Sequence, residues 1–260
     1  MEMINQIILA LVQGITEFLP VSSSGHLALL QNFFGEVNIS FDVFLHFASL
    51  LAIITYFYKD ICEIIKDFLM FNKKSKNFKL AIYLIIATIP AAIFGYFMNN
   101  YISYFFLDIS LLAVTFAITG IFLFTASKIK KNKALNIKNT FIVGLAQALA
   151  ILPGLSRSGA TISTGILMGI KKKEAIRFSF LLAIPAIIGA TMLKMDGLSF
   201  TFSLIIPFFV TFISGLFSIH ILMKYIKQEN LRYFAYYCWL VALLIVLSKL
   251  AMPVIIIDVN

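Results

Sequence analysis

The chain has 260 residues, of which 61% are apolar and only 13% are charged, and its formal net charge is +9. Soluble domains are about 45–50% apolar and about 25% charged, so this composition excludes an ordinary soluble protein. Several runs of about 18 or more residues carry almost no charge, which is enough to cross a hydrocarbon core of about 30 Å. The alternating pattern of a membrane β-barrel is absent. The sequence therefore predicts an all-α polytopic membrane protein.

The first expected element is a helical hairpin over 5–34, broken at Pro20. Polar and helix-breaking residues gather at the break in the stretch LPVSSSGH, 19–26, between apolar flanks. Glu17 precedes the break at membrane depth, where a charged side chain costs about 2.5–3.5 kcal/mol on insertion scales. Non-helical backbone at this depth is tolerated only where it is buried in protein or lines a wet cavity. We therefore expect this hairpin to form part of a polar site.

Six full transmembrane helices and a second hairpin follow along the chain. The expected spans are 41–58, 80–98, 110–127, 178–194, 203–223 and 233–257. The second hairpin occupies 140–170, between the third and fourth spans, and is broken at Pro153 and Gly154. Arg157 follows this break, so each hairpin carries one charged residue at membrane depth.

Basic residues alternate with the spans. They lie in 59–79, 128–138 and 171–177 and at Lys224, Lys227 and Arg232. The loops between these groups carry acidic residues and almost no positive charge, with Glu36, Asp42, Asp108 and Asp196 among them. This alternation follows the positive-inside rule, which makes the basic loops cytoplasmic and argues against a nucleic-acid partner. Because both loops that flank 140–170 are basic, that segment is expected to be re-entrant, and both termini are expected on the outer face.

The two hairpins resemble each other at a constant offset of 134 residues. The matching pairs are Leu11 and Leu145, Gln13 and Gln147, Ser22 and Ser156, Ser24 and Ser158, and Gly25 and Gly159. Two related halves that enter from opposite faces make an inverted repeat, in which sites form near the midplane between broken helices. We expect one integral membrane domain, 1–260, with a first repeat at about 1–127 and a second at about 139–257.

Hydroxyl side chains surround Glu17 and Arg157 in both hairpins. An ion pair that only holds the hairpins together is one explanation, but it leaves these hydroxyls without a role. A polar pocket for an anion explains them better, because helix N-termini and glycine N–H groups after each break would face the ligand. The guanidinium of Arg157 supplies a fork suited to phosphate oxygens.

The stretch QGITEFLPVSSSGH at 13–26, together with PGLSRSGAT at 153–161, resembles the bacterial undecaprenyl-diphosphate phosphatase family, also called the bacitracin-resistance protein. The resemblance covers the whole chain in length, hydropathy and motif order. It implies an enzyme of the bacterial plasma (inner) membrane that removes the terminal phosphate of undecaprenyl diphosphate. The product is the monophosphate carrier lipid that is recycled for cell-wall synthesis. Bacitracin would then compete for the lipid substrate and not for the protein, and a homodimer is left open.

Residue by residue, the resemblance implies catalytic roles for Glu17, Ser23, His26 and Arg157. The phosphate-binding set that it implies is Gln13, Ser22, Ser24, Gly25, Ser156, Ser158, Gly159 and Thr161. The acidic motif carries an amide at Gln13, which leaves Glu17 as the only carboxylate expected at the site. A divalent cation, Mg²⁺ or Ca²⁺, is also implied; the sequence has no standard metal motif, so we expect the cation to arrive with the diphosphate, with Glu17 as its candidate ligand.

Several alternatives stay open at this point. Either Ser23 or a water could attack the phosphorus, and either Glu17 or His26 could accept the proton. His46 and His220 are expected to be interhelical histidines outside the site. A lipid-phosphate transporter or flippase would use the same pocket, but it would not need the density of hydroxyls, imidazole and carboxylate around one arginine. A purely structural subunit would leave Glu17 and Arg157 unexplained.

Overall fold

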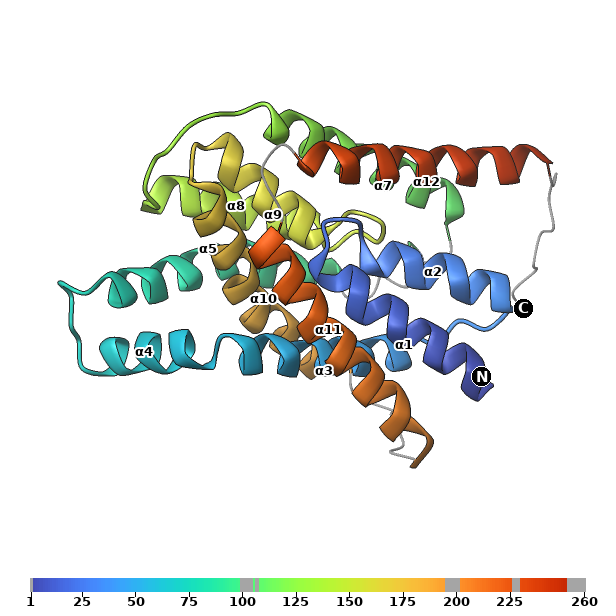
Figure 1. Cartoon of the computed structure of the whole chain (residues 1–260), viewed down its shortest axis with the longest axis horizontal. Coiled ribbons are helices and arrows are strands. Elements are labelled where there is room, and N and C mark those ends of the chain that lie inside the picture. Colours follow the sequence, from blue (N-terminus) through green and yellow to red (C-terminus); the bar gives the residue numbers. More distant parts are fainter. Residues whose placement is uncertain (1, 99–104, 106–107, 195–201, 226–229, 252–260) are drawn as a thin grey trace.

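A computed structural model of the chain describes residues 2–98, 105, 108–194, 202–225 and 230–251. Its helices (Figure 1) are α1 (Met3–Phe18), α2 (Ser23–Phe34), α3 (Ile39–Tyr56), α4 (Tyr58–Leu69), α5 (Lys76–Met98), α7 (Ile109–Ser127), α8 (Ile137–Leu149), α9 (Arg157–Leu167), α10 (Lys172–Lys194), the short 3₁₀ helix η1 (Phe202–Leu204), α11 (Ile205–Tyr225) and α12 (Leu231–Ala251). Within these residues the only β-type pairing is an isolated bridge between Lys133 and Ile170. The predicted all-α fold is confirmed.

Six helical segments of the described chain are long and apolar enough to cross a membrane, as predicted. They are α3, α5, α7, α10, η1 with α11, and α12. Their bounds agree with the expected spans to within a few residues, except that α10 begins six residues earlier than expected, inside the basic loop. The expected end of the last span at 252–257, the loop segments 99–104 and 195–201 with Asp196, and Lys227 lie outside the described residues.

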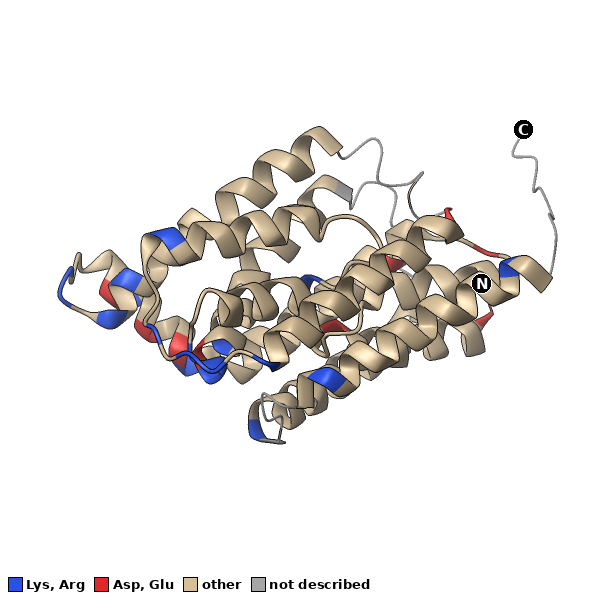
Figure 2. Cartoon of the chain, turned by 90° about the horizontal axis from the view of Figure 1, so that it is seen from above, with Lys and Arg blue, Asp and Glu red and all other residues tan. Residues whose placement is uncertain are grey.

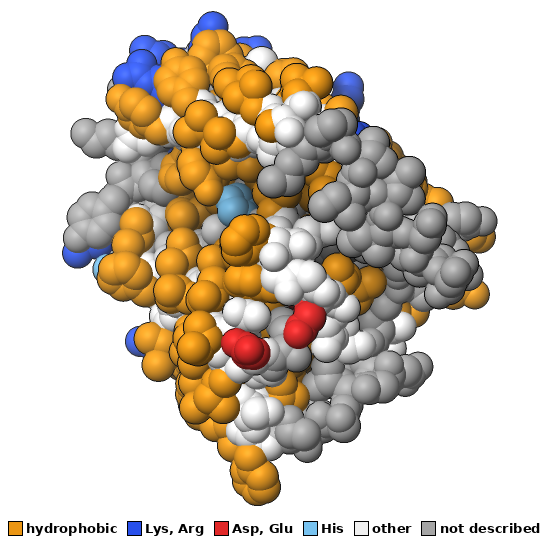
Figure 3. All heavy atoms as spheres, turned by 90° about the vertical axis from the view of Figure 1, so that its right-hand side faces the viewer, with side chains coloured by type: hydrophobic (Ala, Val, Ile, Leu, Met, Phe, Trp, Pro, Cys, Tyr) orange, Lys and Arg blue, Asp and Glu red, His pale blue; other side chains and the backbone are white. Residues whose placement is uncertain are grey.

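The charged residues are distributed unequally between the two ends of the molecule. Most Lys and Arg lie toward the left-hand end in Figure 2, where the loops after α4, α7 and α9 come together. The opposite end, where the chain begins, carries acidic residues. Figure 3 looks onto that end and shows Asp and Glu in the middle of a largely hydrophobic face, with Lys and Arg only toward its edges. The tertiary structure therefore preserves the polarity from which the positive-inside orientation was predicted.

Both expected hairpins are present as pairs of helices that pack on each other. α1 and α2 join at Pro20, and α8 and α9 join at Pro153 and Gly154. The second hairpin begins and ends at the same end of the molecule. A 2.6 Å hydrogen bond from the Lys133 N–H, before α8, to the carbonyl of Gly169, after α9, joins its two ends. That both hairpins enter a bilayer and return to one face stays a prediction.

The helices pack in an exchanged pattern between the two halves of the chain. α1 packs on α11, α8 packs on α5, α3 packs on α10, and α7 packs on α12. Suppose that α1, α3, α5 and α7 correspond, in this order, to α8, α10, α11 and α12. The contact between α1 and α11 then corresponds to the contact between α8 and α5. The contacts between α3 and α10 and between α7 and α12 each correspond to themselves. A two-fold relation between the halves would produce this pattern. The inverted repeat itself stays a prediction.

Glycines allow the two exchanged pairs to approach closely. A Cβ atom on Gly14 of α1 would lie 2.0 Å from Ser214 Oγ of α11, and one on Gly144 of α8 would lie 2.5 Å from the carbonyl oxygen of Ala87 in α5. Small residues at such contacts are typical of membrane helix pairs, because packing between backbones replaces the missing hydrophobic driving force. These contacts hold each hairpin against a span from the other half.

Candidate active site

The two S-x-S-G stretches make the same capping hydrogen bond at the starts of α2 and α9. Ser22 caps α2 and its Oγ accepts a 3.2 Å bond from the Gly25 N–H, while Ser156 caps α9 and its Oγ accepts a 3.0 Å bond from the Gly159 N–H. Serine is a preferred N-cap residue because its hydroxyl satisfies a first-turn N–H that has no helical partner. The two caps differ in backbone conformation: Ser22 has a φ of 69°, which is uncommon outside glycine, and Ser156 has a φ of −64°. The two breaks therefore share their capping hydrogen bond but not the backbone conformation of the cap residue.

The start of α9 lies against the break of the first hairpin. Ser158 Oγ, in the first turn of α9, donates a 3.1 Å hydrogen bond to the carbonyl of Leu19, at the break of the first hairpin. The remaining first-turn N–H groups of both helices carry partial positive charge, which favours an anion between them.

Glu17 is the centre of the site. Arg157 Nη2 donates to its Oε1 at 2.5 Å, Ser23 Oγ donates to its Oε2 at 2.6 Å, and Gln13 Nε2 donates to the same Oε2 at 3.0 Å. Glu17, Ser23 and Gln13 are all buried. The ion pair considered from the sequence does form. It does not satisfy the whole guanidinium, because Arg157 Nη1 is buried without a hydrogen-bond partner in the described part of the chain.

A cavity of about 240 Å³ opens at these residues. Six of the residues predicted from the sequence line it: Glu17, Ser22, Ser23, Ser24, Ser156 and Arg157. The other predicted residues lie behind this lining. Gln13 supports Glu17, and Thr161 donates to the carbonyl of Arg157 at 2.8 Å. The N–H groups of Gly25 and Gly159, expected to face a phosphate, donate to the capping serines instead.

His26 is not part of the cavity lining. Its Nε2 lies 2.7 Å from the hydroxyl of Tyr237, its Nδ1 lies 2.6 Å from the carbonyl oxygen of Ser22, and its ring stacks on Tyr237. The structure therefore brings Ser23 to Glu17, and it leaves His26 in contact with α12. Of the two candidate bases, Glu17 is the one that accepts a hydrogen bond from the Ser23 hydroxyl.

Three polar residues of the cavity lining were not predicted as site residues: Asp42, His46 and Thr191. The prediction that Glu17 is the only carboxylate at the site is wrong, because Asp42 lies in the first turn of α3 and lines the same cavity. His46, expected outside the site, has its Nε2 3.4 Å from Glu17 Oε2. A signal was present, since Asp42 is the one Asp, Glu, Lys or Arg of this helix and His46 lies four residues later, so both share one face.

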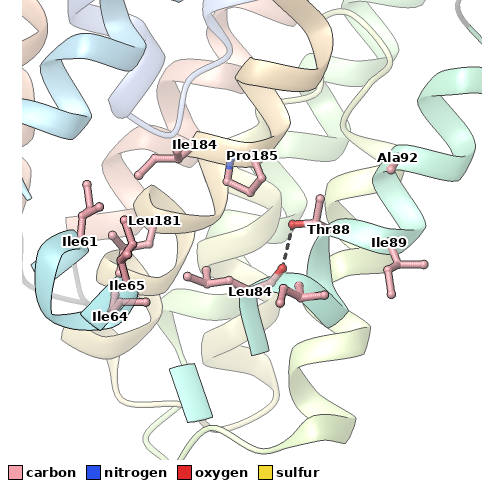
Figure 4. A pocket seen from close by; sticks show the side chains of 11 residues that line it. Ile61, Ile64, Ile65, Leu84, Thr88, Ile89, Ala92, Leu181, Ile184 and Pro185 are labelled. Carbon is pink, nitrogen blue, oxygen red and sulfur yellow. Dashed lines mark hydrogen bonds between the residues drawn. The ribbon is translucent and has the colours of Figure 1, made fainter. Parts of the chain in front are cut away.

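A larger groove of about 420 Å³ lies between α4, α5 and α10 (Figure 4). It is lined almost entirely by aliphatic side chains such as Ile61, Leu84 and Ile184. Its one hydroxyl, on Thr88, donates to the carbonyl of Leu84 within its own helix. The groove offers no group for acid, base or nucleophilic chemistry, so the smaller polar cavity is the candidate active site.

Fold and site together define a class: a polytopic α-helical membrane protein with an anion-accepting cavity between two broken helical hairpins. The family model described as "Bacitracin resistance protein BacA" matches residues 6–244. The chain is 42% identical to the undecaprenyl-diphosphatase of Thermosipho africanus, over 92% of this chain and 98% of that protein. It is 39% identical to the undecaprenyl-diphosphatase of Methanococcus vannielii, over 93% and 98%, and 41% identical to undecaprenyl-diphosphatase 1 of Shouchella clausii, over 94% and 96%. The chain belongs to the bacitracin-resistance protein family.

Proposed function

We propose that this chain is a membrane phosphatase that removes the terminal phosphate of undecaprenyl diphosphate and leaves undecaprenyl phosphate. The observation that carries the proposal is the 2.6 Å hydrogen bond from Ser23 Oγ to Glu17 Oε2, beside the guanidinium of Arg157. A nucleophile, a base and an anion-binding cation thus share one cavity. The names of the relatives in its own family supply the substrate. Neither the geometry nor these names favour the transporter alternative.

Phosphoryl transfer needs an in-line nucleophile and neutralisation of the charge on the phosphate oxygens. Ser23 Oγ attacks the terminal phosphorus, and Glu17 takes the Ser23 proton. The bond from phosphorus to the bridging oxygen breaks, and the lipid monophosphate leaves with the electron pair and receives that proton. Water then attacks the phosphoserine, Glu17 accepts a proton from the water, and the Ser23 oxygen regains a proton as inorganic phosphate departs.

Arg157 binds the transferred phosphate through its unpartnered Nη1 while Nη2 holds Glu17 in place. The remaining first-turn N–H groups of α2 and α9 would bind the other oxygens, together with the hydroxyls of Ser22, Ser24 and Ser156, which line the cavity. These groups are positioned before the substrate arrives, which lowers the cost of reorganisation in the transition state.

A divalent cation, Mg²⁺ or Ca²⁺, is expected to enter with the diphosphate and to neutralise charge on its oxygens. The part of the chain that the structure describes contains no group of three or more His, Cys, Asp or Glu side chains that could hold a metal ion. Mg²⁺ needs no such cage, since it is usually bound through one or two carboxylates and the substrate's own phosphates. The carboxylates of this cavity therefore fit a cation that arrives with the substrate.

The enzyme is expected in the plasma membrane, with its basic loops in the cytoplasm and both termini outside. The prenyl chain of the substrate would stay in the bilayer while the diphosphate enters the cavity.

Phosphate release from undecaprenyl diphosphate by the purified protein in lipid nanodiscs tests the proposal. Wild type should release phosphate, and a chelator should stop the release. Ser23→Ala should abolish turnover with little loss of substrate affinity. The reason is that the bond between Ser23 Oγ and phosphorus begins to form only in the transition state and does not contribute to binding the substrate. The matched control is Ser127→Ala, at the end of α7, where the hydroxyl only donates to the carbonyl of Phe124. If folded wild type with Mg²⁺ releases no phosphate, the proposed function is wrong; if Ser23→Ala keeps its turnover, water is the nucleophile.

A further inference from the structure

Three residues of the cavity lining carry a buried polar atom without a hydrogen-bond partner among the described residues. These atoms are Asp42 Oδ2, Arg157 Nη1 and Thr191 Oγ1. Buried polar groups are normally hydrogen-bonded, so unpartnered atoms that share a cavity call for a ligand. One of the three is a cation that attracts an anion, and one is a carboxylate oxygen that attracts a cation. The lining therefore suits a ligand that carries both charges.

Asp42 is held in a defined orientation. Its Oδ1 accepts a 2.5 Å hydrogen bond from Gln31 Nε2, and Gln31 Oε1 in turn accepts a 2.9 Å bond from the backbone N–H of Asn38. Asp42 is 3% exposed and Gln31 is fully buried. Outer partners of this kind orient the ligands of metal sites. The arrangement uses one carboxylate oxygen for positioning and leaves the other free.

Glu17 has no comparable free oxygen. Its Oε1 accepts from Arg157, and its Oε2 accepts from both Ser23 and Gln13. A cation at Glu17 would have to displace the nucleophile or the arginine. Asp42 can accept a cation without breaking any of these contacts.

A free carboxylate in a cavity that takes a diphosphate would repel the substrate unless a cation lies between them. Burying a charge without a partner costs several kcal/mol. We propose that Asp42, through Oδ2, is the protein ligand of the divalent cation that enters with the diphosphate. The Thr191 hydroxyl, which lines the same cavity from α10, would bind a water of the hydrated cation. This inference rests on the proposed function, and it names which of the two cavity carboxylates holds the metal.

Mn²⁺ binding to the purified full-length protein tests the assignment. The titration contains methylenediphosphonate, a diphosphate that is not hydrolysed, and electron paramagnetic resonance counts the free Mn²⁺. Asp42→Asn keeps an oxygen that can accept from Gln31 and replaces only the free oxygen. Loss of an outer partner of a metal ligand already costs about 10–100-fold in affinity, so this variant should bind Mn²⁺ at least about tenfold more weakly. Asp67→Asn, near the end of α4 and outside the cavity, is the matched control and should bind as wild type does.

A carboxylic acid that donates a proton to the phosphate would behave differently. The amide of Asp42→Asn could also donate, so Mn²⁺ affinity and turnover would stay near wild type, and that result would overturn the proposal. Should Asp42→Asn fail to fold, Fe²⁺ and ascorbate with the wild-type protein give a second measurement, because bound iron cleaves the backbone beside its ligands. Cleavage within residues 38–46 supports the proposal, and cleavage only elsewhere overturns it.

The two proposals can fail separately. Wild type that binds Mn²⁺ with methylenediphosphonate but releases no phosphate from undecaprenyl diphosphate would refute the proposed function and leave Asp42 as a cation ligand. Wild type that turns over, with Mn²⁺ affinity unchanged in Asp42→Asn, would refute the cation ligand and leave the phosphatase.

Discussion

Replacing Arg157 by lysine separates the shape of its side chain from its charge. In the structure the guanidinium uses Nη2 for Glu17, while Nη1 is buried beside the cavity with no hydrogen-bond partner among the described residues. A lysine ammonium is a single point on a flexible stem, so it can reach Glu17 or the phosphate but does not reproduce the planar fork. Arg157→Lys should therefore be strongly damaging, although it keeps one of the two contacts that Arg157→Ala removes.

The size of the loss follows from the contact that lysine gives up. A hydrogen bond to a charged group contributes about 1.5–3 kcal/mol. Because each 1.36 kcal/mol is a factor of ten in rate, kcat/KM should fall by about 10- to 150-fold. If lysine stays on the phosphate and releases Glu17, the base loses its position and kcat carries the loss. If it stays on Glu17, substrate affinity carries the loss.

Steady-state phosphate release from undecaprenyl diphosphate in nanodiscs, together with the melting temperature, measures this effect. Arg177→Lys is the matched control, since Arg177 lies on α10 and pairs with Asp60 outside the cavity. Lysine at position 157 with most of the wild-type turnover would refute the fork. If the melting temperature of Arg157→Lys falls far enough that unfolding accounts for the lost activity, the main role of Arg157 is to hold the hairpins together.

Further substitutions test other contacts. Ser24→Ala should lower kcat/KM in the same assay by a factor that corresponds to about 1–3 kcal/mol, because the Ser24 hydroxyl lines the cavity and would donate to a charged phosphate oxygen. An unchanged kcat/KM would show that Ser24 does not bind the phosphate. His46→Ala should lower kcat about two- to tenfold, since it removes the imidazole whose Nε2 lies 3.4 Å from the Glu17 carboxylate. An unaltered kcat would show that His46 has no part in turnover. In a cysteine-free background, cysteine in place of Val37 should react with an impermeant thiol reagent on intact cells, and cysteine in place of Lys130 should not; the opposite result would invert the predicted orientation.

The sequence by itself determined the class of fold and the identity of most polar residues of the cavity. Span length and charge asymmetry reflect the cost of burying polar groups in lipid, which acts locally along the chain. Glu17 and Arg157 could be found for the same reason, because a charge at membrane depth is costly wherever the chain later folds. The likeness of the two S-x-S-G stretches could be recognised because N-capping is a local interaction.

Only the tertiary structure decided which of these residues meet. The contacts of Glu17 with Ser23 and with Arg157 join residues 6 and 140 positions apart. The separation of His26 from the cavity depends on Tyr237, on the last described helix. The spacing of Asp42 and His46 indicates one shared helix face, but not that this face meets the cavity, because the burial of Asp42 against Gln31 and its place in the cavity result from the packing of α2, α3 and α10 around it. Such distances depend on how helices pack across the whole chain, and no window of sequence contains them.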